Sequence, residues 1–381
     1  MADSKAIVGA VVLVVVLAAA YMLLHGGGGQ ASTTTAAAPG TAAATAAGGG
    51  GQVRLLGSGS TFVKPAMDRW AAEFQKRTGV IVEYTGGGSG KGVSDILQGL
   101  VDFAASDPPL PRSKWMQVRG RILQFPVVLG AVVVTYNLPG LGNVSLNFTG
   151  EVLAKIYMGE IRYWDDPAIK KLNPAVADKL PHKEIIAVHR SDASGTTAIF
   201  TTFLSKAYKP WAEKVGAGKL VDWPVDKTGN GIGAEGNQGV TLTIKENPYS
   251  IGYVEWAYAL ENKLPIARIM NPAGRFVAPS RESVSAAFRV KNLPGPDGDW
   301  SSVYKQFVYS NASPDAYPIA GQTFMLVYKS YKDPAKCNAV KEFIRFIAGQ
   351  GQDMLPKGYA PLPENLRQVA EKAADMIECG G

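Results

Sequence analysis

Three glycine-rich turns hold the residues best suited to chemistry. The first is GSGSTFVKPAM at residues 57–67, where glycines follow a predicted strand and Pro65 fits the first turn of a helix. Ser60, Thr61 and the backbone N–H of Phe62 would then lie at a helix N-terminus. Such an end carries about half a positive charge and several unpaired donors, which suits an oxyanion. Alone the motif is weak, because serine and threonine cap helices generally.

The second turn lies in YTGGGSGKGVSDIL at residues 84–97, again between a predicted strand and a predicted helix. Ser89 supplies the hydroxyl donor of this loop. The GSGKG string resembles a nucleotide-binding P-loop, but Thr85 stands where that motif needs its first glycine. Gly92 also replaces the hydroxyl residue that would hold Mg²⁺. A nucleotide site is therefore not expected here.

The third turn is HRSDASGTTAIF at residues 189–200. Arg190 offers a planar fork of donors with a fixed positive charge, and Asp192 could orient it. The start of the following helix adds hydroxyl and N–H donors from Ser194, Gly195 and Thr196. An ordinary capped helix with a surface ion pair remains an equal alternative for this segment taken alone.

Asp107, in VDFAASDPPL at residues 101–110, is the acceptor that would select the anion. By itself it is most simply a turn residue before two prolines. Among the donors above, however, its carboxylate would repel a fully ionised ligand and attract one that carries a proton. Phosphate carries a proton at neutral pH and sulfate does not, so this combination predicts rejection of sulfate.

Other kinds of site find little support in the sequence. The three histidines, at positions 25, 182 and 189, are isolated from one another, and neither Cys337 nor Cys379 has a second ligand at metal spacing. No metal or other cofactor is expected. The two cysteines could form a disulfide in an oxidising compartment or remain free thiols. A phosphatase is not supported, since Ser194 has only His189 nearby as a possible base.

Length and charge restrict the protein class. The 381 residues exceed one compact core and suit two lobes once the N-terminus is set aside. The net charge is +7, but lysine and arginine are scattered, whereas a nucleic-acid-binding protein would concentrate them in a patch. We therefore expect no nucleic-acid partner.

Strand-like and helix-like segments alternate from residue 53 onward, which indicates an α/β fold that could position the three turns. The predicted strands are Val53–Leu56, Val80–Tyr84, Ala131–Tyr136, Ile185–His189, Ile251–Val254 and Phe324–Tyr328. The predicted helices include Ala66–Arg77, Val93–Leu100, Ala198–Ala207 and Ala339–Ile347. A further glycine-rich loop, exposed or near the cleft, is expected at Gly229–Gly239.

The N-terminus predicts an extracytoplasmic location. Residues 6–24 are 19 uncharged, mostly apolar residues, long enough as a helix to span about 28 Å of bilayer. Lys5 precedes them and no Lys or Arg follows until Arg54, so the body should lie outside the membrane. The segment also resembles the class III signal peptides of archaeal surface binding proteins. Cleavage stays open, with retention as an anchor favoured over full release. Residues 26–52, rich in Gly, Ala and Thr, should form a tether.

Taken together, these segments resemble the phosphate-binding protein of the phosphate ABC transporter, over residues 53 to about 366. The likeness rests on motifs that occur in the right order: GSGSTF, YTGGGSGKGV, VDFAASDPPL, QFPVV, IYMGEIRYWDDPAI, HRSDASGTT, SIGYVEWAYA and YPIAGQTF.

The resemblance implies a two-lobed, periplasmic-binding-protein-like type II fold with a cleft between the lobes, preceded by an N-terminal apolar helix. The implied segments are 1–25 (signal or membrane anchor), 26–52 (tether), 53–137 with 318–381 (lobe 1) and 138–317 (lobe 2). The implied phosphate contacts are Thr61, Phe62, Ser89, Asp107, Arg190, Ser194, Gly195 and Thr196, supported by Asp192 and Ser60.

The implied function is non-enzymatic: capture of inorganic phosphate and delivery to the permease subunits of an ABC transporter. A different class of function is also consistent with the apolar segment and tether. In that alternative the chain is a surface structural or filament-forming protein built on the binding fold.

Overall fold

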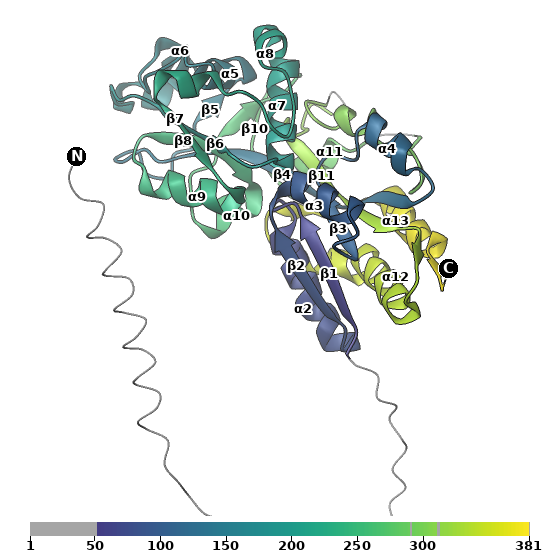
Figure 1. The fold of residues 1–381 in the computed structure, drawn as a ribbon. Helices are drawn as coiled ribbons and strands as arrows, with labels where there is room; N and C mark the ends of the chain where they lie inside the picture. The colour runs from purple at the N-terminus through teal and green to yellow at the C-terminus, as the bar shows by residue number, and fades with distance from the viewer. Residues whose placement is uncertain (1–51, 290–291, 311–312, 381) are drawn as a thin grey trace, which may run out of the picture. The chain divides into compact units, whose positions relative to one another are not determined.

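The computed structural model describes residues 52–289, 292–310 and 313–380 (Figure 1). The predicted anchor at residues 1–25 lies outside this range, as does the predicted tether apart from Gln52. Gly51–Gly381 group into one structural unit. No helix in the described part of the chain has the length and apolarity needed to span a bilayer.

One portion of the main sheet has the strand order β2-β1-β3-β11-β4. β1 pairs in parallel with β2 and with β3, whereas β11 is antiparallel to both β3 and β4. We call this portion, with the helices packed on it, the first lobe. Its elements are β1 (Arg54–Gly59), α2 (Lys64–Thr78), β2 (Ile81–Gly86), α3 (Gly88–Leu97), β3 (Phe103–Ser106), β11 (Ala320–Tyr328), α12 (Pro334–Ala348), β13 (Tyr359–Ala360) and α13 (Glu364–Met376).

Strand β4 (Ile122–Tyr136) joins this lobe to the next one, and every one of its residues is buried. Its residues up to Ala131 pair with β11, and Val132–Tyr136 pair with β8 (Ser250–Glu255). The sheet then continues from β8 to β6 (Ile186–Arg190) and β7 (Gly231–Ala234). We call the part built on β8, β6 and β7 the second lobe.

The remaining elements extend or connect these two lobes. They are α4 (Arg112–Val118), β5 (Asn147–Phe148), α5 (Gly150–Tyr157), α6 (Pro167–Leu172), η1 (Pro174–Lys179), α7 (Gly195–Ala207), α8 (Lys209–Lys214), η2 (Pro224–Thr228), α9 (Gly236–Glu246), α10 (Trp256–Glu261), β9 (Arg268–Met270), β10 (Phe276–Val277), α11 (Arg281–Ala286), η3 (Tyr304–Gln306), β12 (Ser330–Tyr331), η4 (Gln350–Met354) and β14 (Glu378–Cys379).

The structure confirms the α/β class and the six predicted strands, with differences in extent. The predicted strand Ala131–Tyr136 is the second part of β4, which starts nine residues earlier, at Ile122. Pro126 argued against a longer strand, because proline has no N–H to donate within a sheet. It is tolerated in β4 because the pairing of β4 with β11 shifts register beside it, as at a β-bulge.

Two other local predictions differ from the structure in extent. The helix expected at Val93–Leu100 is α3, which begins at Gly88 and ends at Leu97. The glycine run itself therefore forms the first turns of that helix. The glycine-rich segment Gly229–Gly239 is only partly a loop, since it contains β7 and the start of α9.

The lobe limits 53–137, 138–317 and 318–381 stay a prediction. Parts of the expected second lobe contact the first: Gln124 N–H donates to Pro296 O at 2.8 Å, and Arg281 Nε donates to Tyr359 O at 3.1 Å. Ala267 N–H also donates to Val134 O at 3.0 Å, in the part of β4 that pairs with β8, so the chain after α10 contacts both halves of the sheet.

A disulfide joins Cys337 in α12 to Cys379 in β14, which resolves the alternative left open by the sequence. Cys337 is fully buried, whereas Cys379 is exposed. The bond closes a loop of 42 residues and holds the C-terminal strand β14 beside its parallel partner β12.

We expect Cys379→Ser to lower the free energy of unfolding by about 2–4 kcal/mol, because the cross-link limits the entropy of the unfolded chain. Urea denaturation of the wild type and the variant measures this difference. Wild-type protein in reducing buffer should unfold at the urea midpoint of the variant. Equal midpoints for the oxidised wild type and the variant would contradict a stabilising role.

Candidate anion-binding site

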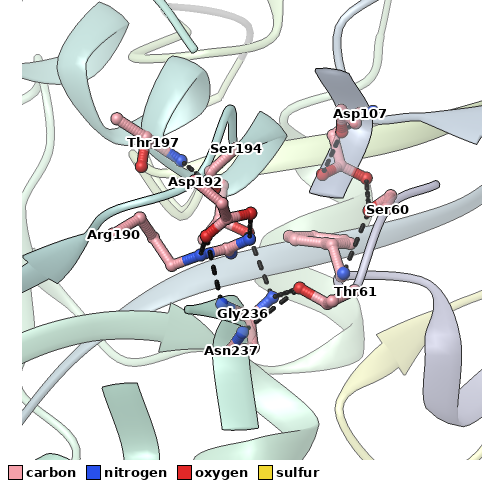
Figure 2. Close-up of polar contacts among 12 residues, drawn as sticks. Ser60, Thr61, Asp107, Arg190, Asp192, Ser194, Thr197, Gly236 and Asn237 are labelled. Atoms are coloured by element: carbon pink, nitrogen blue, oxygen red, sulfur yellow. Dashed lines mark hydrogen bonds and ion pairs between the residues drawn. The ribbon is translucent and has the colours of Figure 1, made fainter. Parts of the chain in front are cut away.

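The ten residues singled out from the sequence come together where the N-terminus of α7 in the second lobe approaches the first lobe. Figure 2 labels six of them: Ser60, Thr61, Asp107, Arg190, Asp192 and Ser194. The ten residues come from the ends of β1, β3 and β6 and from the first turns of α3 and α7. β1 and β3 are parallel neighbours, so the turns that follow them lie at one edge of the first lobe. β6 runs in the opposite direction in the second lobe, and the turn that follows it meets that edge through the Gly90 N–H bond to Ala193 O.

Asp107 follows β3, and its side chain is only 1% exposed. Oδ1 accepts hydrogen bonds from Ser60 Oγ at 2.6 Å and Thr323 Oγ1 at 2.9 Å, and Oδ2 accepts one from Ser89 Oγ at 3.2 Å. Burial raises the pKa of Asp107 to about 6, although these hydroxyls and the charge of Arg190 oppose the rise. The carboxyl group is therefore ionised at neutral pH and faces hydroxyl donors from three elements.

The turn after β1 holds Ser60 and Phe62. Gly59 has φ 133°, and a Cβ there would lie 2.1 Å from Ala105 O, so only glycine fits this close approach. Ser60 N–H donates to the same Ala105 O at 2.9 Å. The Phe62 N–H, expected from the sequence to face a ligand, donates to Ser60 Oγ at 2.9 Å.

Ser89 lies in the first turn of helix α3, not in a loop as predicted. Gly88 before it has φ 85°, and a Cβ at this position would lie 2.4 Å from Asp192 Oδ2 of the second lobe. Gly90 N–H donates to Ala193 O at 2.9 Å, so the start of α3 bonds directly across the junction of the lobes. The glycines of this segment permit that contact.

Arg190, at the end of β6, forms a two-point ion pair with Asp192. Nε donates to Oδ1 at 2.6 Å, and the second bond joins Nη2 to Oδ2. The Arg190 side chain is 1% exposed, and its Nη1 also donates to Thr196 Oγ1 at 3.4 Å. Burial opposes ionisation of Asp192, but the hydrogen bonds and charge of Arg190 outweigh it and lower the pKa of Asp192. The guanidinium is thus held in one orientation.

The N-terminus of α7 points at the first lobe. Ser194 caps the helix, with its Oγ accepting from Thr197 N–H at 3.0 Å. A Cβ on Gly195 would lie 2.2 Å from Asp107 Oδ2 and 2.3 Å from Ser89 Oγ. Only glycine therefore lets this helix end approach the Asp107 carboxyl group so closely.

Asn237, in the first turn of α9, connects the two lobes and was not predicted. Its Nδ2 donates to Thr61 Oγ1 at 2.9 Å and to Thr196 Oγ1 at 3.1 Å, while its Oδ1 accepts from Glu255 N–H at 2.9 Å. Asn237 is fully buried. The sequence signal was available, since Asn237 follows a glycine-rich stretch at a helix start, as Ser89 does. Thr323, within the YPIAGQTF motif, was missed as well.

His189 has no role as a base for Ser194. Its Nε2 lies 2.8 Å from Asp226 Oδ1, its Nδ1 lies 3.1 Å from Arg190 O, and its ring stacks on Trp223. Both ring nitrogens thus have partners. In the described part of the chain, no group of three or more His, Cys, Asp or Glu side chains could hold a metal ion. The arrangement offers fixed donors and one buried carboxylate, which can bind an anion.

Comparison with known proteins points in the same direction. Residues 31–350 match the family described as the PBP superfamily domain. The phosphate-binding protein PstS of Methanocaldococcus jannaschii is 44% identical over 333 residues, which cover 84% of this chain and 85% of that protein. The PstS protein of Pasteurella multocida is 40% identical, over 82% of this chain and 88% of the relative.

A solved structure of a high-affinity periplasmic phosphate-binding protein with phosphate bound has a similar fold. Its TM-score is 0.66 at 21% sequence identity, and the match covers 84% of this chain and 93% of that one. This likeness and the family match confirm the predicted two-lobed, periplasmic-binding-protein-like fold.

We expect the buried Asp107 carboxyl group to make stability depend on pH. Its pKa is about 6 in the folded protein against 3.8 ordinarily, so the folded state binds more protons between these values. The protonated carboxyl group stabilises the folded protein at low pH. As the pH rises through 6 this stabilisation is lost, and the free energy of unfolding falls by up to about 3 kcal/mol. Ligand-free Asp107→Asn should therefore gain stability relative to the wild type between pH 4.5 and 7.

Urea denaturation at several pH values, in buffers free of small oxyanions, measures this difference. A stability difference between Asp107→Asn and the wild type that stays constant with pH would contradict the assignment.

Proposed function

This chain belongs to the family of PstS phosphate-binding proteins, and from that premise we propose its function. It captures inorganic phosphate outside the cytoplasm and passes it to a phosphate ABC transporter. The observation that carries this proposal is the Asp107 carboxylate, which is only 1% exposed and is surrounded by hydroxyl donors where the two lobes meet. Its role is binding rather than catalysis.

The donors would hold phosphate between the lobes. Arg190 would supply oriented guanidinium donors, and the N-terminus of α7 would add backbone N–H groups with the positive end of its dipole. The proposed contacts are Thr61, Phe62, Ser89, Asp107, Arg190, Ser194, Gly195 and Thr196, with Asp192 and Ser60 supporting them. The hydrogen bond that now joins the Phe62 N–H to Ser60 Oγ would rearrange so that this N–H can face the anion.

Asp107 would give the selectivity. With a pKa of about 6, Asp107 is mostly ionised at neutral pH, so its carboxylate can accept a hydrogen bond from the O–H group of singly protonated phosphate. Sulfate brings no proton and would leave two negative charges in contact inside a buried site. Both HPO₄²⁻ and H₂PO₄⁻ can donate such a hydrogen bond.

Binding would close the lobes, which we propose to be residues 53–137 with 318–381 and residues 138–317. Bonds that cross the junction, such as Gly90 N–H to Ala193 O and Asn237 to Thr61, would then lock the closed form. β4 runs through both lobes and is one part of the hinge between them.

The partners would be the permease subunits of the transporter and the membrane itself. Residues 6–24 would anchor the chain and residues 26–52 would tether it, so that captured phosphate stays near the permease. The alternative of a surface structural protein depends on this same N-terminal region, which lies outside the described residues. None of the described residues favours it.

Calorimetric titration of the full chain with phosphate, arsenate and sulfate tests the ligand. We expect phosphate and arsenate to bind, because both carry a proton at neutral pH. Sulfate should bind about a thousandfold more weakly, because it has no O–H to donate to the Asp107 carboxylate and its negative charge repels that carboxylate. Sulfate affinity equal to phosphate affinity would disprove the selectivity argument.

Asp107→Asn should lose much of the discrimination between the anions. An amide at this position can donate to sulfate, so sulfate affinity should rise at least tenfold while phosphate affinity changes less. Asp315→Asn is the matched control, since Asp315 is an exposed carboxylate paired with Arg275. If Asp107→Asn rejects sulfate as well as the wild type does, another group sets the selectivity.

Asn237→Ala should weaken phosphate binding about tenfold to a hundredfold. The change leaves the hydroxyl groups of Thr61 and Thr196 without the amide that links them, so closure brings less stabilisation. Gln238→Ala, an exposed neighbour in the same helical turn, should bind like the wild type. Unchanged affinity in Asn237→Ala would remove this residue from the site.

A further inference from the structure

Lys219 is a second cation beside the anion site that belongs to none of the three turns. It lies in the second lobe, between α8 and η2. Its backbone O accepts from the N–H of Ser194, the residue that caps α7. Its Nζ donates to Ser106 Oγ at 3.2 Å, and Ser106 ends β3 directly before Asp107. One residue therefore contacts both sides of the junction.

The ionisable groups of the ligand-free site sum to no net charge only when the Lys219 ammonium is included. The two-point ion pair cancels the charges of Arg190 and Asp192. Burial raises the pKa of the nearby Glu255 well above its ordinary value, which favours the neutral form of this side chain. Asp107 would then leave the site with one net negative charge, which opposes an incoming anion. The Lys219 ammonium offsets it.

A cavity of about 830 Å³ leads to Lys219. Gly90, Pro108 and Ala198 line it, and each lies within a few residues of a proposed phosphate contact. Arg112, Lys114 and Lys305 line it too, whereas none of its described lining residues is Asp or Glu. Arg112 pairs with Asp299, but Lys114 and Lys305 form no ion pair with a described residue. An anion in this cavity meets positive charge on several sides.

We propose that Lys219 is an affinity-determining residue of the phosphate site, whose ammonium offsets the charge of Asp107 and ties the second lobe to Ser106. This inference rests on the proposed function and extends its set of binding residues. Lys219 acts from the second lobe, so its favourable interaction is complete only when the lobes are together. Phosphate capture and lobe closure are thereby linked through one side chain.

This role gives phosphate affinity a pH dependence. Burial lowers the pKa of Lys219 to about 8, although the charge of Asp107 opposes this. The other charged groups around the cavity are Arg112 and Lys114 from α4 and Lys305 from η3; Tyr304 stays neutral, because burial raises its pKa. Affinity should fall as pH rises through 8 and Lys219 loses its proton. Phosphate also changes from H₂PO₄⁻ to HPO₄²⁻ at the lower end of this pH range, so the part of the fall that reflects Lys219 is the part that Lys219→Met and Lys219→Arg do not share.

The test is calorimetric titration of the full chain with inorganic phosphate between pH 7.5 and 9.5, for the wild type, Lys219→Met and Lys219→Arg. Wild-type affinity should fall about tenfold over this range. Lys219→Met should bind at least tenfold more weakly than the wild type at pH 7.5, with little further change. Lys219→Arg should restore affinity and remove the fall, because a guanidinium stays charged throughout. Lys209→Met, an exposed lysine in α8, is the control for loss of charge alone and should behave like the wild type.

The outcomes separate this inference from the proposed function. Wild-type protein that binds no phosphate at any pH overturns both. Wild-type protein that binds phosphate, with Lys219→Met showing the same affinity and the same pH profile, overturns only the role of Lys219. If Lys219→Met fails to fold, the wild-type profile decides: constant affinity between pH 7.5 and 9.5 overturns the inference.

Discussion

Asp107 places an ionisable carboxyl group where water has almost no access, and a charge in such a position costs several kcal/mol unless donors surround it. The donors are hydroxyl groups of Ser60, Ser89 and Thr323, which come from the turn after β1, the start of α3 and strand β11. Three elements must therefore keep their places for one carboxylate to be tolerated. This constraint makes the edge of the first lobe a rigid half-site.

The second half-site is rigid for a related reason. Arg190 is almost fully buried, and an unpaired guanidinium there would be as costly as an unpaired carboxylate. Asp192 satisfies it from two residues away, and Gly236 N–H fixes Asp192 in turn with a bond to Oδ1 at 3.0 Å. The pair is neutral overall, so it contributes oriented donors with little net charge. Selectivity can then depend on Asp107.

Glycine determines how closely the two halves approach. Gly88 and Gly195 stand on opposite sides of the junction, and a Cβ on either would collide with polar atoms of the other lobe. The continuous strand β4 keeps both lobes on one sheet while allowing the second lobe its own set of strands. The glycines let the two lobes come close enough to form hydrogen bonds at the site, and β4 keeps the lobes joined through one continuous sheet.

Much of the site could be predicted from the sequence, because residue type and local spacing determine which groups can donate or accept. A strand, then glycines, then Ser or Thr at a helix start predicts donors at a helix N-terminus wherever it occurs. The sequence motifs also identified Asp107 and the Arg190–Asp192 pair. They misplaced Ser89 in a loop, because glycine lowers helix propensity and packing against the other lobe overrides it at α3.

Only the tertiary structure could place Thr323 and Lys219 beside the site, and it alone shows which residues Asn237 contacts from its glycine-rich helix start. Each is a common polar residue that matters only because folding brings it to partners that are remote in sequence. Asn237 bonds to Thr61, 176 positions away, and Thr323 bonds to Asp107, 216 positions away. The same holds for Cys337 and Cys379, which the sequence left either paired or free. Local chemistry determined what each turn could hold, whereas the packing of two lobes on one sheet decided which residues surround Asp107.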